Sequence, residues 1–292
     1  MGLLSGLEHF VTEAEPLAAH TWLRLGGPAK YFAEPTNQDE LATLVTRCCE
    51  NEVPVRLLGG GSNVLVRDRG VDGMVVLLTA PAFGEIAVKG NIVRAGGGAR
   101  LGHVVSTSVR EGLAGLEQLV GIPGSVGGAL HGNAGDHGAD VGQVTCSATV
   151  MTRAGEVLTR GREEMNFAYR SSSLDELVIL EAQFELESED PAELTRRMQK
   201  QWILKKASQP LSNENVGCVF KSPGGISAAS LIEQAGLKGA TVGGATVSDR
   251  DANFIVAGDG ATSDDVLQLI EMLRSEVSQR LGVELELQLD VW

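Results

Sequence analysis

Residues 58–66 read Leu58-Gly59-Gly60-Gly61-Ser62-Asn63-Val64-Leu65-Val66, so three consecutive glycines separate two apolar runs. Glycine lets the backbone adopt positive φ and come close to a ligand, and successive N–H groups in such a turn form a concavity that binds anions. Ser62 and Asn63 add neutral side-chain donors. The segment therefore predicts a phosphate or pyrophosphate site built from dipoles. It matches neither GxGxxG nor GxxxxGK(S/T), so a tight loop between two buried strands remains an equal alternative.

Length and charge narrow the class of protein. The chain has 292 residues and a net charge of −14. This length predicts about two or three domains, and this charge argues against nucleic acid or an anionic membrane as a partner. No apolar run reaches the length of about 18 residues that a membrane span needs, and Met1–Glu15 does not resemble a signal peptide. The cysteines show no metal-ligand spacing, so we expect a cytoplasmic protein with reduced thiols and no metal site.

The glycine segment lies inside an α/β unit. Thr36-Asn37-Gln38-Asp39 has the form of a helix-capping box, and the apolar residues after it recur at helical spacing, with Cys48 on the buried face. The helix ends before Val53-Pro54, where a strand begins that leads into the glycines. Strand, helix, strand, glycine-rich turn and strand together predict an α/β unit over about residues 29–79.

A second glycine cluster follows further along the chain. Glu85–Gly98 has the pattern of a hairpin, and a helix is expected from Leu101 until Gly112 ends it. The cluster itself reads Gly121-Ile122-Pro123-Gly124-Ser125-Val126-Gly127-Gly128-Ala129, and Asn133-Ala134-Gly135 follows shortly after. Two such clusters in one chain favour a long phosphate ligand with several parts, such as a dinucleotide.

Strands and one basic helix are expected next. Residues 143–188 read as strands, interrupted by a turn that places Arg170 beside Tyr169 and several hydroxyl groups. An acidic boundary at Glu187–Pro191 precedes a helix over about 193–206 that is rich in lysine and arginine. In so acidic a protein this basic helix is either a solvated face or a cluster that faces phosphate.

The last part of the chain ends in one helix and one strand. A short helix is expected over 228–237 and a strand over 253–256. Thr262-Ser263-Asp264-Asp265 caps a final helix that has a single apolar stripe. Apolar and polar residues then alternate over Val283–Val291, which predicts a half-buried strand.

Several short segments together resemble one family. In chain order they are TWLRLGG from Thr21, the GGGSN loop, IPGSVGG followed by NAG, FAYRSS, GCVFKSP, LIEQAGLKG and Ala252-Asn253-Phe254. In this combination and order they resemble the UDP-N-acetylenolpyruvoylglucosamine reductases from about Thr21 to Trp292. The stretch between Ser171 and Leu186 is too short for the extra tyrosine-bearing loop of one subtype, so the chain resembles the shorter subtype.

The resemblance implies a fold and an activity. The fold would be an FAD-binding PCMH (vanillyl-alcohol-oxidase type) fold with two α/β subdomains, 1–79 and 80–189. A C-terminal α+β substrate-binding domain, 190–292, would follow, and its last strand, 283–292, can return to the first subdomain. The activity would be reduction of UDP-N-acetylglucosamine enolpyruvate to UDP-N-acetylmuramate by NADPH through FAD. That reaction serves peptidoglycan synthesis, and with it cell-wall biogenesis, cell shape and cell division. We expect a cytoplasmic monomer that binds neither nucleic acid nor membrane.

The resemblance also assigns roles to residues. It places the FAD pyrophosphate on Gly59, Gly60, Gly61, Ser62, Asn63, Ile122, Pro123, Gly124 and Ser125, and it places Asn133 and Gly135 near the flavin. It places the substrate on Tyr169, Lys206, Lys221, Ser222 and Glu286, with Lys206 facing the UDP phosphates. It implies no metal.

The chemistry of that reaction asks for two further groups. Hydride addition to an enol ether conjugated to a carboxylate leaves negative charge on the α-carbon and the carboxylate, so a cation and an acid are needed. Arg170 suits the carboxylate because it is permanently charged and bidentate. Cys218 stands where the family usually has a serine as proton donor, and a thiol with a pKa of about 8.5 is a far stronger acid than a hydroxyl.

The sequence departs from the family pattern at the last catalytic carboxylate. Gln288 aligns with that position, and glutamine can donate a hydrogen bond but cannot supply a proton. Glu286 lies on the same strand face, about 7 Å away. Either the register slips and Glu286 acts, or Gln288 serves as a neutral donor, which we favour, or the carboxylate is missing. Ser222 also replaces a usual asparagine, and Asp251 replaces a frequent histidine.

Two other functions stay open at this point. A flavin oxidase of the PCMH type would use oxygen on an alcohol or a sugar, although FAYRSS and GCVFKSP argue against it. A sugar-nucleotide binder would have lost turnover through the changes at Cys218 and Gln288.

Overall fold

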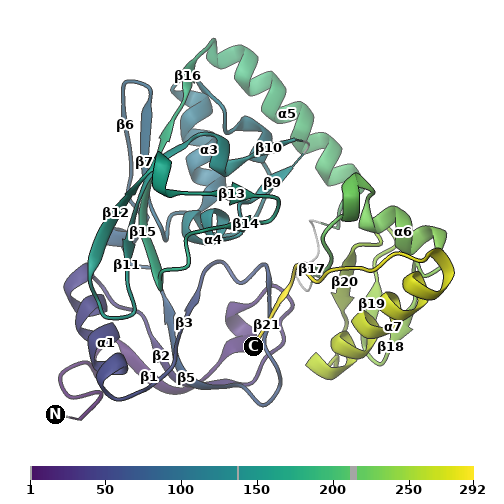
Figure 1. Cartoon of the computed structure of the whole chain (residues 1–292), viewed down its shortest axis with the longest axis horizontal. Coiled ribbons are helices and arrows are strands. Elements are labelled where there is room, and N and C mark those ends of the chain that lie inside the picture. Colours follow the sequence, from purple (N-terminus) through teal and green to yellow (C-terminus); the bar gives the residue numbers. More distant parts are fainter. Residues whose placement is uncertain (1, 137, 211–215) are drawn as a thin grey trace. The chain divides into compact units, whose positions relative to one another are not determined.

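The structure is a computed structural model that describes residues 2–136, 138–210 and 216–292. The chain forms two compact units. Unit 1 comprises Met1–Glu15, Lys30–Gly60 and Asp72–Ile203, and unit 2 comprises Pro16–Ala29, Gly61–Val71 and Leu204–Trp292. Figure 1 traces the chain through both. The three-domain division expected from the sequence stays a prediction.

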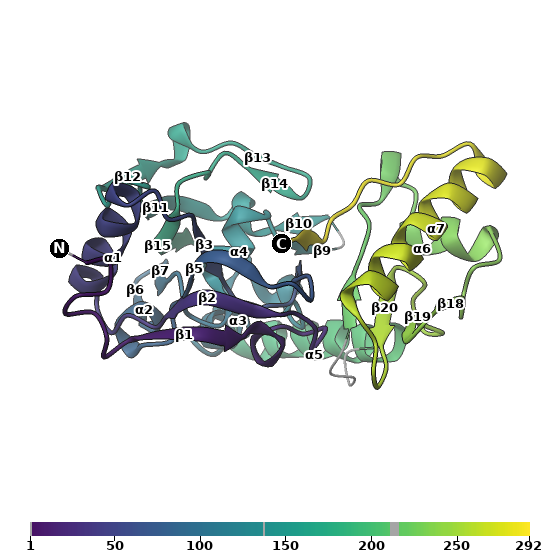
Figure 2. The ribbon, with the colours of Figure 1, turned by 90° about the horizontal axis from the view of Figure 1, so that it is seen from below.

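The first sheet of unit 1 contains strands of the predicted α/β unit. Its strand order is β1 (Val11–Pro16), β2 (Pro28–Ala33), β5 (Val71–Leu77) and β3 (Val55–Leu58), and β3 runs parallel to β5. Helix α1 (Gln38–Glu50) lies beside this sheet in Figures 1 and 2. The buried face of α1 includes Cys48, as predicted, and burial raises the pKa of its thiol to about 11.

The N-terminus of α1 is held by a small hydrogen-bond network. Asn37 is the N-cap, one residue later than the predicted capping box implied, and its side chain accepts a bond from the backbone N–H of Glu40. The Glu40 carboxylate accepts bonds from the N–H of Thr36 at 2.7 Å and from its hydroxyl at 2.8 Å. The backbone bond from Thr36, with a smaller contribution from His9, lowers the pKa of Glu40 to about 2.

Glu40→Gln tests this network through its pH dependence. Folding lowers the pKa of Glu40 from 4.5 to about 2, so the ionised carboxylate stabilises the fold above pH 4.5 and this contribution is lost as the pH falls towards 2. We expect Glu40→Gln to lower the melting temperature at neutral pH, and the difference from the unaltered chain to shrink across that window. Thermal melts in a pH series measure this. Asp39→Asn is the control, and a difference that stays constant with pH would contradict the prediction.

The second sheet of unit 1 has five antiparallel strands. Their order is β12 (Val157–Gly161), β11 (Thr145–Met151), β15 (Val178–Glu185), β7 (Ile92–Gly96) and β6 (Ile86–Lys89). Helices α3 (Leu101–Arg110) and α4 (Val126–His131) lie on one side of it in Figure 1. Their apolar residues share one core with the sheet. The predicted hairpin near 85–98 and the helix from Leu101 are confirmed.

Short elements complete unit 1. They are α2 (Pro81–Gly84) and the pairs β8 (Leu113–Ala114) with β16 (Glu187–Ser188), β9 (Gly135–Asp136) with β10 (Ala139–Asp140), and β13 (Phe167–Ala168) with β14 (Ser171–Ser172). Single 3-10 turns occur in the chain at Leu17–His20, Glu117–Leu119, Val141–Gln143, Arg162–Glu164 and Pro223–Gly225. Residues 173–177 alone join β14 to β15, so the extra loop is absent here, as the resemblance implied.

The basic helix predicted from the sequence is α5 (Pro191–Ser208). Its Arg197 is paired with Glu117, whose side chain is buried, and with Glu189. The hydrogen bond that Arg197 donates to Glu189 is the main reason why the pKa of Arg197 is raised. At Arg197, therefore, the positive charge ties α5 to neighbouring elements through two ion pairs.

Unit 2 has an α+β core of its own. Its sheet has the order β17 (Val216–Cys218), β20 (Phe254–Ala257), β19 (Ala245–Val247) and β18 (Thr241–Val242). Helices α6 (Ala228–Gln234) and α7 (Ser263–Leu281) contribute to the same hydrophobic core. The capping box predicted for α7 is present, with Thr262 and Asp265 bonded reciprocally, and so is its buried apolar stripe.

The C-terminal segment alternates as predicted but is not one continuous strand. Leu285 and Leu289 are buried, and the acidic residue between them is exposed. Leu287 makes an isolated bridge to Phe220, whereas β21 (Asp290–Val291) pairs in parallel with β4 (Val64–Leu65). The strand prediction was right about the buried face and wrong about the length of the strand, because no single neighbour runs alongside the whole segment. In the part of the chain that the structure describes, no helix is long and apolar enough to cross a bilayer.

Candidate active site

The two predicted glycine clusters touch each other in unit 1. A Cβ atom on Gly60 would lie 2.6 Å from the Cα of Gly124, and one on Gly59 would lie 2.8 Å from the Oγ of Ser125. Ser125 also caps α4 by accepting a bond from the N–H of Gly128. A side chain at Gly60 would fill the contact between the loops. The bare backbone there fits the close approach that a diphosphate such as that of FAD needs.

The end of the first glycine loop belongs to unit 2 and holds the C-terminal segment. Gly61 has φ +66° and its carbonyl accepts a bond from the N–H of Trp22. The Asn63 side chain donates to the carbonyl of Gln288 at 3.0 Å, and the Asn63 carbonyl accepts from the N–H of Asp290 at 3.0 Å. The assignment of Asn63 to the FAD pyrophosphate stays a prediction. What the structure adds is that this amide positions the segment that contains Gln288.

The side chain of Asn133 links two backbone segments of unit 1. Its side chain is buried, donates to the carbonyl of Ala168 at 2.9 Å and accepts from the N–H of Gly142 at 3.0 Å. Its backbone has φ +42°, which is uncommon for a residue other than glycine. Both ends of the amide are thus engaged with backbone, so Asn133 shapes the surroundings of the predicted flavin site by fixing the hairpin β13–β14.

Arg170 occupies the turn of that hairpin. Ala168 pairs with Ser171, so Tyr169 and Arg170 form a two-residue turn. Arg170 has φ +57°, a left-handed conformation that costs a residue with a Cβ about 1–2 kcal/mol. Its Nε is buried and has no hydrogen-bond partner among the described residues. Strain and an unsatisfied charged donor together are typical of a site that awaits a ligand.

The guanidinium of Arg170 keeps an aromatic neighbour. Its Cζ lies 5.6 Å from the ring centroid of Tyr169, and the Tyr169 side chain is 59% exposed. The hairpin is further anchored because the hydroxyl of Ser172 donates to the carbonyl of His131. The predicted residues Tyr169 and Arg170 therefore lie on one anchored hairpin of unit 1, and Asn133 holds that hairpin through Ala168.

A second group of predicted residues lies together in unit 2. Cys218 ends β17, is half-buried, and accepts a bond at Sγ from the side-chain amide of Asn253 at 3.3 Å. Lys221 pairs through Nζ with Glu286 at 2.6 Å, and its N–H donates to the Glu286 carbonyl at 2.9 Å. The N–H of Gln288 donates to Val219 at 2.7 Å. The C-terminal segment is thus fixed beside the strand of Cys218.

The structure bears on the choice between Glu286 and Gln288. Glu286 is exposed and neutralised by Lys221, whereas Gln288 is half-buried and its backbone is held at both the N–H and the carbonyl. The structure therefore fixes the backbone of Gln288 in the C-terminal segment. The catalytic assignment itself stays a prediction.

The remaining predicted substrate residues lie elsewhere in unit 2. The hydroxyl of Ser222 accepts a bond from the N–H of Ala228, at the start of α6. Lys206 is exposed on α5, directly after the buried Lys205. Asn253 was missed as a site residue by the sequence analysis. Its signal was the Asp251-Ala252-Asn253 turn before a strand, where aspartate and asparagine bond to nearby backbone.

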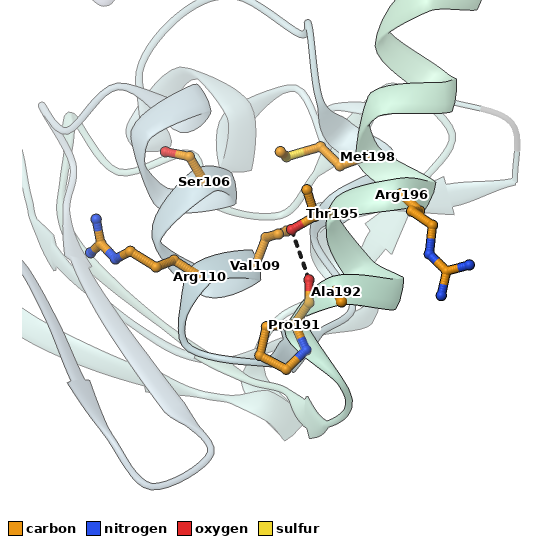
Figure 3. A pocket seen from close by; sticks show the side chains of 8 residues that line it. All are labelled: Ser106, Val109, Arg110, Pro191, Ala192, Thr195, Arg196 and Met198. Carbon is orange, nitrogen blue, oxygen red and sulfur yellow. Dashed lines mark hydrogen bonds between the residues drawn. The ribbon is translucent and has the colours of Figure 1, made fainter.

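A pocket of about 570 Å³ lies between α3 and α5 of unit 1 (Figure 3). Its wall is mostly apolar and includes Val109 and Met198. Arg110 and Arg196 flank it, but each is paired with a neighbouring glutamate, and their side chains point in opposite directions in Figure 3. None of the predicted site residues lines this pocket, so it is separate from the candidate active site.

Known proteins match both parts of the chain. Residues 29–161 match the profile of an FAD binding domain, and residues 209–292 match that of the UDP-N-acetylenolpyruvoylglucosamine reductase C-terminal domain. A curated protein of Rhodopirellula baltica named UDP-N-acetylenolpyruvoylglucosamine reductase is 41% identical over 286 residues, which cover 98% of this chain and 94% of the relative. The chain belongs to the UDP-N-acetylenolpyruvoylglucosamine reductase family.

Further relatives agree with this membership. A reductase of the same name from Symbiobacterium thermophilum is 44% identical over 284 residues, 97% of this chain and 92% of the relative. The crystal structure of the reductase from Thermus caldophilus covers 97% of this chain and 98% of its own, with a TM-score of 0.82 and 35% identity. A BBE-like protein of Physcomitrella patens shares only the fold, with a TM-score of 0.51 and 17% identity over 64% of this chain and 45% of its own.

These matches confirm the fold class and the cofactor expected from the sequence. The reductase family joins an FAD-binding fold of the PCMH type to a C-terminal domain of its own, and both are matched here. The touching glycine loops of unit 1 suit the diphosphate of FAD, so the residues present fit the cofactor.

Proposed function

We propose that this chain reduces UDP-N-acetylglucosamine enolpyruvate to UDP-N-acetylmuramate, with FAD as cofactor and NADPH as hydride donor, in peptidoglycan precursor synthesis. Its family membership supports the reaction. The single observation that supports it within the structure is the strained turn that presents the unsatisfied Nε of Arg170. A permanently charged, bidentate side chain is what the carboxylate of an enolpyruvyl group requires.

The chemistry divides between the cofactor and the chain. Bound FAD supplies hydride transfer from NADPH to the terminal carbon of the enol ether. Gly59, Gly60 and the loop Ile122–Ser125 would hold its diphosphate by backbone dipoles. Arg170 stabilises the negative charge that spreads into the substrate carboxylate. Because these groups are fixed by the fold before the substrate binds, they need not reorganise during the reaction.

The reaction also needs a proton donor. The thiol of Cys218 donates the proton to the α-carbon, so that one hydride and one proton add across the double bond and a thiolate remains. Gln288 acts as a neutral hydrogen-bond donor to the developing enolate. Lys206 provides positive charge for the UDP phosphates, and Tyr169, Ser222, Lys221 and Glu286 provide further polar groups for the substrate.

The setting of the reaction follows from its reactants. NADPH and sugar nucleotides are cytoplasmic metabolites, so we place the enzyme in the cytoplasm, and we expect it to act as a monomer. Size-exclusion chromatography with light scattering measures the oligomeric state.

The decisive experiment distinguishes three functions of the purified protein: a reductase, an oxidase and a binder. The reductase should be yellow and should oxidise NADPH only when the enolpyruvyl UDP-sugar is present. A flavin oxidase would instead consume oxygen with an alcohol or a sugar and without NADPH. A binder that has lost turnover would bind the UDP-sugar without reducing it. A protein that shows no flavin spectrum after FAD is added would overturn the proposal.

Cys218→Ala tests the proton donor. We expect FAD reduction by NADPH to stay intact and the following half-reaction, reduction of the substrate, to slow by about 10²-fold or more, because general acids contribute about 10²–10⁴-fold. Stopped-flow absorbance separates the two half-reactions. Cys218→Ser should keep appreciable activity, and Cys49→Ala, at an exposed cysteine of α1, is the control. Unchanged turnover in Cys218→Ala would make Cys218 a packing residue.

A further inference from the structure

The side chain of Asn253 is locked in one orientation next to Cys218. Its Oδ1 accepts a bond from the N–H of Phe220 at 2.9 Å, and its Nδ2 donates to the Phe220 carbonyl at 2.8 Å. A backbone N–H can only donate and a carbonyl can only accept, so these two bonds fix which end of the amide is nitrogen. The same Nδ2 lies 3.3 Å from the Sγ of Cys218. An N–H donor is therefore aimed at the sulfur.

The backbone of Asn253 is held as firmly as its side chain. Its N–H donates to the carboxylate of Asp251 at 2.9 Å, and its carbonyl accepts from the N–H of Val219 at 2.9 Å. The residue closes the turn that leads into β20, whose Phe254 pairs with Cys218. Five bonds thus place the amide relative to β17 before any substrate arrives.

We propose that Asn253 is a positioning residue for Cys218: its amide holds the sulfur in place and donates to it, so that the thiol can release its proton. This inference rests on the proposed function. A hydrogen bond to the charged form of a group favours that form, and Cys218 is charged only after it has given its proton to the substrate. Asn253 therefore stabilises the thiolate that remains on Cys218 after the proton has been transferred.

Two charged groups lie close to this pair in the chain. Lys221 follows on the same segment, but its ammonium is paired with Glu286 of the C-terminal segment. Asp251 precedes β20, and burial raises the pKa of its carboxyl. The amide of Asn253 differs from these groups because it is neutral at every pH, so its effect on the sulfur does not itself titrate.

Asn253→Asp is the sharpest test. The aspartate keeps the shape and an oxygen that can accept the Phe220 N–H, but it replaces the donor to sulfur by a negative charge. Like charge disfavours the thiolate. We expect the pH profile of Cys218 alkylation by iodoacetamide, followed by mass spectrometry of its peptide in the FAD-loaded protein, to move up by about one pH unit or more. At neutral pH the rate should fall about tenfold. Asn253→Ala, which removes the donor without adding charge, should give a smaller rise.

Two internal references and one variant serve as controls. Cys49 is exposed, so its alkylation measures the reactivity of the reagent at each pH. Cys48 is fully buried, so its alkylation indicates unfolding. Asn91→Asp makes the same chemical change at an exposed asparagine of unit 1 that bonds to Glu185, and it should leave the Cys218 profile unchanged. A Cys218 profile that is the same in Asn253→Asp and in the unaltered chain would overturn the proposal.

A second measurement applies if Asn253→Asp does not fold. In the unaltered chain labelled with ¹⁵N-asparagine, the side-chain amide resonance of Asn253 should shift with pH at the midpoint of Cys218 alkylation, and this shift should vanish in Cys218→Ala. An Asn253 amide resonance that does not shift at that midpoint would overturn the proposal. Neither readout requires turnover, so a chain that lacks reductase activity but shows both effects refutes the proposed function and leaves the thiol–amide coupling supported.

Discussion

Arg170→Asn is expected to lower kcat by about 10²–10³-fold, because removing one fixed donor to a developing oxyanion typically costs that much. The reduction of FAD by NADPH should proceed as before, since the substrate carboxylate is not involved in it. Asparagine tolerates the left-handed backbone of residue 170 better than most residues do. The fold should therefore survive, and the melting temperature should stay close to that of the unaltered chain.

Single-turnover kinetics measure this prediction by following the two half-reactions separately. Arg162→Asn is the matched control, because the guanidinium of Arg162 lies 5.6 Å from the ring of Phe167 in the same hairpin. Arg170→Lys keeps the charge but loses the bidentate fork, and it should fall between the two. If Arg170→Asn reduces the substrate at the original rate, Arg170 is only a turn residue.

Gly60→Ala is expected to weaken FAD binding by about tenfold or more. Its Cβ would lie 2.6 Å from the Cα and 3.3 Å from the carbonyl carbon of Gly124, and backbone atoms cannot move aside as a flexible side chain can. Overpacking of this kind costs about 1–3 kcal/mol, and about 1.4 kcal/mol corresponds to a tenfold change in Kd. The strain falls on both predicted diphosphate loops at once.

Flavin fluorescence quenching, measured by titrating FAD into the stripped protein, gives the dissociation constant. Gly102→Ala makes the same substitution in α3, where nothing lies within 4 Å of the new Cβ. That variant should bind FAD normally and be slightly more stable, because alanine favours helices over glycine. An FAD dissociation constant that Gly60→Ala leaves unchanged would show that the two loops can separate without loss of the site.

Local sequence patterns predicted the elements whose stability is local. The stripe and capping box of α7 and the buried face of α1 follow from spacing along one helix, and the structure confirms both. The hairpin that carries Arg170 was placed as a turn for the same reason. Its left-handed conformation was not foreseen, because arginine gives no sign that it will adopt the backbone of a glycine.

Contacts between distant segments could not be read from the sequence. Each glycine cluster was visible, but nothing in either one says that Gly60 lies against Gly124. Asn63 reads as a loop donor, yet its partner is the carbonyl of Gln288. Asn253 appears as part of a strand until the structure shows its amide between Phe220 and Cys218. In each case tertiary packing selects one partner among many that the residue type allows.

The parallel pairing of β21 with β4 also constrains how the protein is made. Asn63 and Gln288 are separated by 225 residues, so the first glycine loop emerges from the ribosome long before the partner that fixes it. Contacts of such long sequence separation form slowly, and strand edges that wait for them expose a nascent chain to aggregation. Until synthesis reaches β21, β4 therefore lacks the strand with which it pairs in the finished fold.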